Sequence, residues 1–279
     1  MKITLLGTGT PLLDPTRQQS ALLVEIEDTK LLVDAGRGVT SQLLKIGLQP
    51  QQIDEVFITH HHYDHISNLG EFLLTAWHNG RTLPLMIYGP PGTAEIVAAL
   101  FQKIYARDIA FALFNNGEMA DIKKIVQVTE VTAGLIRNTH HYRIFTEYVN
   151  HGNSLGLSPE NWPCLGYRIE AHRKVIALSG DTVACVGLDR LAQAADCLIQ
   201  CCYLAEAEIT TPGLERLATH VIASARQAGQ IAAHNQVKQL VLTHIRPKSE
   251  AMMQSLIEDV RGSYGGELLL GEDLMVINV

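Results

Sequence analysis

The stretch EVFITHHHYDH, residues 55–65, joins a short apolar run to a dense group of candidate metal ligands. The apolar run predicts a buried β-strand, and the polar residues after it predict a loop at the end of that strand. Side chains two positions apart in an extended segment point the same way, so His60 and His62 can reach one metal ion. Asp64 and His65 then face a second position nearby. Imidazole and carboxylate ligands suit Zn²⁺, with Mn²⁺ or Fe²⁺ as alternatives.

Outward from this stretch, short apolar runs alternate with helical stretches and turn signals. Strands are predicted over residues 2–6, 20–26, 30–34, 55–59, 85–88, 125–131, 142–149, 165–169, 175–178, 197–201 and 239–243. Helices are predicted over residues 39–46, 69–77, 91–105, 221–234 and 250–261. Strands grouped with intervening helices in both halves of the chain indicate an α/β sandwich. No linker or sequence repeat divides the chain, so we expect a single domain over residues 1–279.

Composition and charge exclude several classes of protein. The chain has 279 residues, of which 47% are hydrophobic and 18% charged, and this excludes disorder and coiled coils. The apolar runs are strand-sized and the N-terminus lacks a signal-peptide pattern, so we expect a cytoplasmic protein without membrane contact. Five cysteines without a CxxC pair are expected to be buried, reduced thiols. The formal charge of −7 argues against a dedicated nucleic-acid binder.

The residues His60, His62, Asp64 and His65, placed directly after a strand, resemble the HxHxDH signature of the metallo-β-lactamase superfamily. This resemblance implies a four-layered αββα fold, in which two sheets pack face to face with helices outside. It also implies two divalent metal ions, most simply Zn²⁺, at one edge between the sheets. The strand and helix pattern of the chain agrees with such an α/β architecture.

The superfamily places further ligands at later strand ends, and each has a match here. His151 in VNHG, Asp181 in LSGDT and His244 in LTHIRP all follow predicted strands. The resemblance implies that His151 completes the first metal position, Asp181 bridges both metals and His244 completes the second position. Asp34 in LVDAG matches an early acidic position of the family and is expected to orient ligands from outside the metal shell.

Further motifs resemble the ribonuclease Z and arylsulfatase-like branch of the superfamily. They are LGTGTP with Arg17 downstream, DAGRG at residues 34–38, YGPPG at residues 88–92, and the Thr219-His220 pair before LTHIRP. In ribonuclease Z a histidine placed like His220 assists the leaving group, so the resemblance implies a general acid here. We expect His220 just before the helix over residues 221–234, where ordinary helix capping or packing is the alternative role.

The resemblance to ribonuclease Z itself breaks down in one segment. That enzyme carries a long basic arm, which grips tRNA, between the positions that match His151 and Asp181. Here these positions are only 30 residues apart, and Gly152–Pro163 contains no Lys or Arg. We therefore expect a small anionic ester as the substrate and do not expect nucleic acid as a partner. The same branch implies a homodimer.

The expected activity is that of a dinuclear metal-dependent hydrolase. A metal-bridging hydroxide would attack a phosphodiester or an aryl sulfate, with Asp64 and His220 as catalytic residues. Arg37 and Arg246 are expected to bind the substrate anion, because Arg offers a planar fork of donors. The alternatives are a ribonuclease Z-type tRNA 3′-processing endonuclease and a lactone or thioester hydrolase. A non-enzymatic ligand-binding relative fits less well, because the ligand set is complete.

Overall fold

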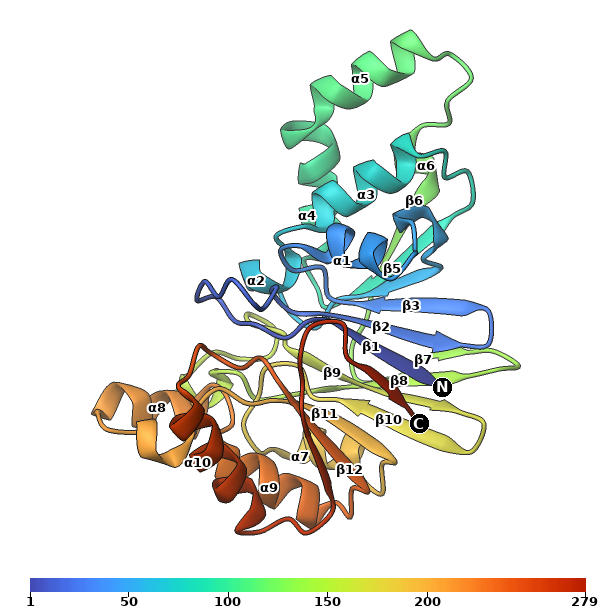
Figure 1. Ribbon diagram of the computed structural model, residues 1–279. Coiled ribbons are helices and arrows are strands. Elements are labelled where there is room, and N and C mark those ends of the chain that lie inside the picture. The colour runs from blue at the N-terminus through green and yellow to red at the C-terminus, as the bar shows by residue number, and fades with distance from the viewer.

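The protein is a sandwich of two sheets with helices on both outer faces, as the computed structural model of residues 1–279 shows (Figure 1). Each sheet has seven strands, and the two sheets lie face to face. Helices α1, α3 and α4 cover the first sheet, and α7, α9 and α10 cover the second (Figure 1). This arrangement confirms the predicted four-layered αββα architecture.

The first sheet combines antiparallel and parallel strands. Its order is β14 (Val276–Asn278), β1 (Lys2–Gly7), β2 (Ala21–Ile26), β3 (Thr29–Val33), β4 (Glu55–Phe57), β5 (Leu85–Gly89) and β6 (Val126–Glu130). Neighbours from β14 to β3 are antiparallel, and neighbours from β3 to β6 are parallel. The parallel strands β3 and β4 therefore end at the same edge of the sheet.

The second sheet repeats this pattern. Its order is β7 (Gly134–Asn138), β8 (Arg143–Tyr148), β9 (Leu165–Ala171), β10 (Lys174–Leu178), β11 (Cys197–Cys201), β12 (Gln239–Thr243) and β13 (Glu267–Leu270). Neighbours from β7 to β10 are antiparallel, and neighbours from β10 to β13 are parallel. Strands β8, β10 and β12 consequently run in the same direction and end at one edge.

Short helices connect the strands. They are α1 (Val39–Lys45), α2 (Tyr63–Ile66), α3 (Leu69–His78), α4 (Thr93–Ala99), α5 (Ala106–Asn115), α6 (Ile122–Ile125), α7 (Val186–Ala192), α8 (Pro212–His220), α9 (Ala225–His234) and α10 (Glu250–Arg261). Single turns are η1 (Pro50–Gln52), η2 (Leu100–Ile104), η3 (Asn153–Leu155) and η4 (Glu206–Glu208), of which η2 is π-helical. None of these helices has the length and apolar character of a membrane span.

The central strands, such as β2 and β11, are apolar on both faces because both faces are covered. In β2, Leu22 and Val24 pack into the core between the sheets, whereas Leu23 between them packs under the helices of the first sheet. In β11, Cys197 and Ile199 face the first sheet, while Leu198 between them faces α9 and α10. Side chains of successive strand residues alternate between the faces, so a strand covered on both sides must be apolar throughout. These runs were the signals that made the strands predictable.

The predicted helix over residues 221–234 is wrong in its first turn. Helix α8 ends at His220, and α9 begins at Ala225, with the Ser224 hydroxyl accepting from the backbone N–H of Gln227. Between them the backbone bonds to other segments, since Ala223 donates to Thr182 and accepts from Tyr203. The apolar residues of this stretch are therefore buried turn residues, and His220 closes a helix rather than preceding one.

Candidate metal centre

The predicted loop after β4 is a tight turn into a helix. His60 and His62 lie on the extended part, and Asp64 and His65 lie in α2. The backbone N–H of His65 donates to the carbonyl of His62 at 3.0 Å, and Ala35 after β3 donates to the carbonyl of His65 at 2.7 Å. These bonds fold the segment back on itself, so side chains close in sequence also converge in space.

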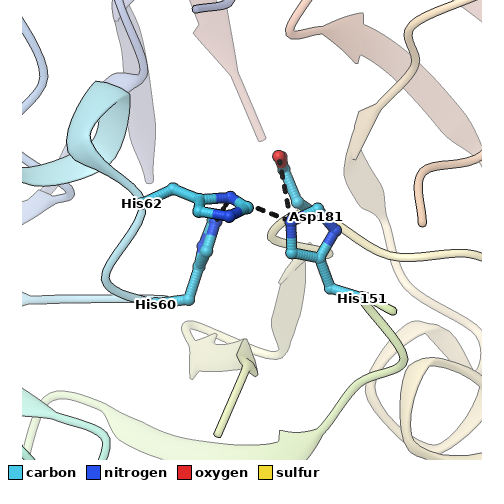
Figure 2. Close-up of side chains that lie close together, drawn as sticks. All are labelled: His60, His62, His151 and Asp181. Atoms are coloured by element: carbon cyan, nitrogen blue, oxygen red, sulfur yellow. Dashed lines mark hydrogen bonds and ion pairs between the residues drawn. The ribbon is translucent and has the colours of Figure 1, made fainter. Parts of the chain in front are cut away.

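The structure brings the seven predicted ligands into two adjacent groups. Within each group the donor atoms lie within 4.8 Å of one another: His60, His62, His151 and Asp181 in the first, and Asp64, His65 and His244 in the second. Figure 2 shows the three imidazoles and the carboxylate of the first group pointing toward one another. Nδ1 of His62 is 3.1 Å from Nε2 of His60 and 3.0 Å from Nε2 of His151. Each group draws residues from both sheets, because His151, Asp181 and His244 follow strands β8, β10 and β12.

Asp181 lies between the two groups. Its Oδ2 is 3.9 Å from Nε2 of His151 in the first group. The same oxygen is 3.6 Å from Nε2 of His65 and 3.4 Å from Nε2 of His244 in the second group. Asp64 belongs to the second group alone, with Oδ2 3.1 Å from Nε2 of His244. One carboxylate therefore reaches both positions, as a bridging ligand must.

The protonation of the first group suits a metal ion. Burial lowers the pKa of His60 well below its usual value, and the neighbouring imidazoles lower it further. Burial, followed by the charge of His151, lowers the pKa of His62 to about 4. Neutral imidazole is the form that binds metals. Burial opposes ionisation of Asp181, but His244 and His65 hold the pKa of its carboxyl well below the usual range.

The carboxylates around the second group favour a bound positive charge. Burial disfavours the imidazolium of His65, yet the carboxylates of Asp181 and Asp34 raise its pKa well above the usual value. Nε2 of His65 and Oδ1 of Asp181 are buried and have no hydrogen-bond partner in the protein. Buried polar atoms without partners are costly, so atoms that converge in this way need a ligand. The donor set fits a divalent metal ion, whose charge the carboxylates would balance.

Asp34 contacts the cluster from outside it. Its Oδ2 lies 2.7 Å from Nδ1 of His65, which directs Nε2 of that ring into the cluster. Thr59 anchors the carboxylate, with its backbone N–H donating to Oδ1 at 2.8 Å and its hydroxyl donating to Oδ2 at 2.9 Å. The backbone of Asp34 is left-handed, with φ of 60°. A strained backbone at this point shows that the surrounding contacts determine its position.

His220 lies beside the cluster. Its carbonyl accepts from the backbone N–H of Gly152 at 2.8 Å, and its Nδ1 is 3.0 Å from the hydroxyl of Ser154. The carbonyl of the next residue, Val221, is 2.6 Å from Nδ1 of His151. The sequence did not single out Ser154, because a serine in a polar segment gives no signal of what it contacts.

The two predicted arginines differ in placement. Arg246 stacks over the ring of Tyr203 with Cζ 5.5 Å from its centroid, and that ring is 6.1 Å from the ring of His244. Nε of Arg246 also lies 3.6 Å from the carboxylate of Glu208. Arg37 is held by its backbone, through hydrogen bonds with Gln19, and its side chain has no hydrogen bond or ion pair. The structure thus joins Arg246, but not Arg37, to the surroundings of the cluster.

Comparison with known proteins identifies the family. Residues 29–245 match the profile of the β-lactamase superfamily domain. A ribonuclease Z of Mycobacterium avium (strain 104) is 32% identical over 289 residues, which cover all of this chain and 98% of that protein. A ribonuclease Z of Mycolicibacterium gilvum (strain PYR-GCK) is 34% identical over 252 residues, covering 88% of this chain and 85% of that protein. The crystal structure of the short form of human tRNase Z is 24% identical, covers 100% of this chain and 99% of that chain, and superimposes with a TM-score of 0.74.

These similarities overturn the expectation that nucleic acid is not a partner. The relatives are named for acting on RNA, and the similarity runs along the whole chain rather than through the ligand motifs alone. The expectation rested on the net charge and on the short segment Gly152–Pro163. Net charge averages over the entire surface and does not describe the site, so it was a poor guide to the substrate. Of the predicted activities, the comparisons favour the ribonuclease Z-type alternative over hydrolysis of a small ester. The chain belongs to the metallo-β-lactamase superfamily of metal-dependent hydrolases, in its ribonuclease Z branch.

Proposed function

We propose that the protein is a metal-dependent endoribonuclease that hydrolyses a phosphodiester bond near the 3′ end of tRNA precursors. The observation that carries this proposal is the pair of donor groups that share Asp181, in a chain similar to ribonuclease Z over its full length. Activity on phosphodiesters follows from the site, and activity on RNA follows from the relatives.

We assign two Zn²⁺ ions to the cluster. His60, His62 and His151 would hold one ion, Asp64, His65 and His244 would hold the other, and Asp181 would touch both. Imidazole and carboxylate donors in these numbers suit Zn²⁺. When bound, such ions supply Lewis acidity and a water of lowered pKa.

The side chains of the protein would handle the protons and the substrate charge. Asp64 would accept a proton from the attacking water, and His220 would deliver one to the departing ribose oxygen. Ser154 holds the ring of His220 through Nδ1, which leaves Nε2 free to face the leaving group. Arg246, fixed against Tyr203 beside His244, would bind a phosphate oxygen, and Arg37 would bind a more distant phosphate.

The first test is a substrate panel with enzyme purified without chelator. A tRNA precursor with a 3′ extension should be cleaved at a single position, and cleavage should stop when a chelator removes the metal. A chromogenic phosphodiester, an aryl sulfate and a lactone are the comparison substrates. Turnover of one of these with no cleavage of the tRNA precursor would refute the proposed activity.

Variants separate the residue roles. Asp181→Ala should remove activity and most of the bound metal, whereas Asp196→Asn, a carboxylate change remote from the cluster, should preserve both. His220→Ala should lower turnover of RNA by about 10²–10⁴-fold, the usual contribution of a general acid. Its effect on a p-nitrophenyl phosphodiester should be much smaller, because that leaving group needs no proton. Equal losses on the two substrates would make His220 structural.

A further inference from the structure

The segment that follows His151 is short and internally bonded. The side chain of Asn153 donates to the carbonyls of Leu157 and Trp162, at 3.0 and 2.9 Å. The same side chain accepts from the backbone N–H of His151 at 3.1 Å. Because Asn153 ties both ends of the segment together, the chain returns to the cluster and places the side chain of Trp162 against it.

Trp162 contacts all three histidines of the first donor group. Its ring centroid is 4.9 Å from that of His62 and 6.3 Å from that of His60. Its Nε1 donates to the carbonyl of His151 at 3.0 Å. The indole is partly buried and packs on the core between the second sheet and its helices, so its orientation is fixed.

His62 differs from the other two histidines in how its ring is held. In His60, Nδ1 lies 3.0 Å from the Thr59 hydroxyl, and in His151, Nδ1 lies 2.6 Å from a backbone carbonyl. Hydrogen bonds of this kind usually set the orientation of a ligating imidazole. In His62, Nδ1 faces the cluster and Nε2 has no hydrogen bond to the protein. His62 is also the exposed member of an otherwise buried group, so surrounding side chains restrict its ring less than those of His60 and His151.

We infer that Trp162 is a positioning residue, which holds His62 in its ligating orientation by packing and fixes the backbone of His151 by a hydrogen bond. The inference rests on the proposed metal centre. Because Nε2 of His62 has no hydrogen-bonding partner in the protein, contact with the Trp162 indole restricts the rotation of this exposed ring. The indole belongs to the segment Gly152–Pro163, which therefore contributes to the metal site although it contains no Lys or Arg.

The test measures metal affinity rather than activity. Zn²⁺ dissociation constants of the wild type, Trp162→Leu and Trp162→Phe are determined by chelator competition. Trp162→Leu keeps apolar bulk but removes the ring and the donor, and should weaken metal binding by the first donor group about 10–100-fold, as removal of an outer partner of a ligand does. Trp162→Phe keeps a ring and should lose less than Trp162→Leu. The matched control is Trp77→Phe, since Trp77 also donates its indole N–H to a carbonyl, that of Ala120, but lies in the core.

The same variants supply a spectroscopic readout, because the chain has only two tryptophans. In Trp77→Phe all tryptophan fluorescence comes from Trp162, and binding of Co²⁺ beside it should quench that emission. In Trp162→Phe the remaining emission comes from Trp77 and should change little. Urea unfolding of the metal-free variants shows whether an affinity loss is separate from a loss of stability.

Each outcome has one meaning. Wild-type protein that binds no metal would refute the proposed metal centre itself. Wild-type affinity in Trp162→Leu, with tight binding by the unmodified protein, would overturn the inference about Trp162 alone. Should Trp162→Leu fail to fold, Trp162→Phe decides, and a change in affinity below about twofold would then overturn the inference, given the 10–100-fold norm.

Discussion

Asp34→Asn should weaken metal binding about 100-fold while leaving the fold intact. The carboxylate of Asp34 can only accept hydrogen bonds, so Nδ1 of His65 must carry the proton and Nε2 is free to ligate. An asparagine amide in the same place can donate to Nδ1. The proton then moves to Nε2, the atom that faces Asp64 and Asp181, and a protonated nitrogen cannot bind a metal.

The size of the effect follows from these contacts. Loss of an outer partner costs about 10–100-fold in metal affinity, or about 1.4–2.7 kcal/mol. Asp34→Asn should lie at the upper end, because the new amide imposes the wrong tautomer instead of merely removing a bond. Asp34→Ala leaves Nδ1 free to find water and should lose less. The oxygen of asparagine can still accept from the Thr59 backbone N–H, so folding should be preserved.

The assay is chelator competition for Zn²⁺, combined with nitrogen-detected NMR of the histidine rings to identify the tautomer of His65. Asp196→Asn is the matched control, since Asp196 also accepts a backbone N–H, that of Val175, at 2.9 Å but belongs to no donor group. Wild-type affinity in Asp34→Asn would refute the tautomer argument. A weaker effect in Asp34→Asn than in Asp34→Ala would refute it as well.

Two further predictions concern stability. Nε of Arg137 on β7 donates to the buried Glu55 on β4 at 2.6 Å, and the side-chain exposures are 35% and 5%. Arg137→Ala leaves a buried carboxylate unpaired and should lower the free energy of unfolding in urea by about 3–5 kcal/mol. Glu55→Ala should lower it clearly less, because the arginine can reach water. Equal losses in the two variants would contradict this reasoning. Burial opposes ionisation of Asp196, but hydrogen bonds from Lys238 and the backbone of Val175 lower its pKa. The ionised Asp196 carboxylate therefore stabilises the fold above the unfolded pKa of about 3.9, and this stabilisation is lost as pH falls through the folded pKa. Asp196→Asn should reduce the fall of the melting temperature at acid pH. An unchanged fall would show that Asp196 does not contribute to it.

The covered strands were predictable and the exposed edge was not. Strands such as β2 and β11 are buried on both faces, so burial forces a continuous apolar run that can be seen in the sequence. Strand β7 lies at the edge of its sheet and is largely exposed, so nothing forces a pattern on Gly134–Asn138. Helix α5 also escaped prediction, since only Ile109 and Ala112 of its residues are buried.

The donor residues that converge in the structure could be singled out from the sequence because their chemistry is local. Four of them lie within six residues, and His151, Asp181 and His244 each follow a recognisable strand. The residues that orient them were harder to find. The contacts of Trp162 and Ser154, to which we assign such roles, depend on how the segment after His151 folds back, and no periodicity records such contacts. The expectation about nucleic acid was wrong for a similar reason, because the net charge of a chain does not report the local potential at a site.

Ligands drawn from both sheets also link metal concentration to folding. An ion that needs the ends of β4, β8, β10 and β12 together binds the native state more tightly than the unfolded chain, which keeps only the donors of residues 60–65 close together. By mass action, free metal at about 1,000 times its dissociation constant adds at most about 4.1 kcal/mol to the free energy of unfolding. The two sheets also share a core of their own, which stabilises the sandwich independently of the metal. The heat tolerance of the enzyme is then set in part by the supply of metal in its surroundings.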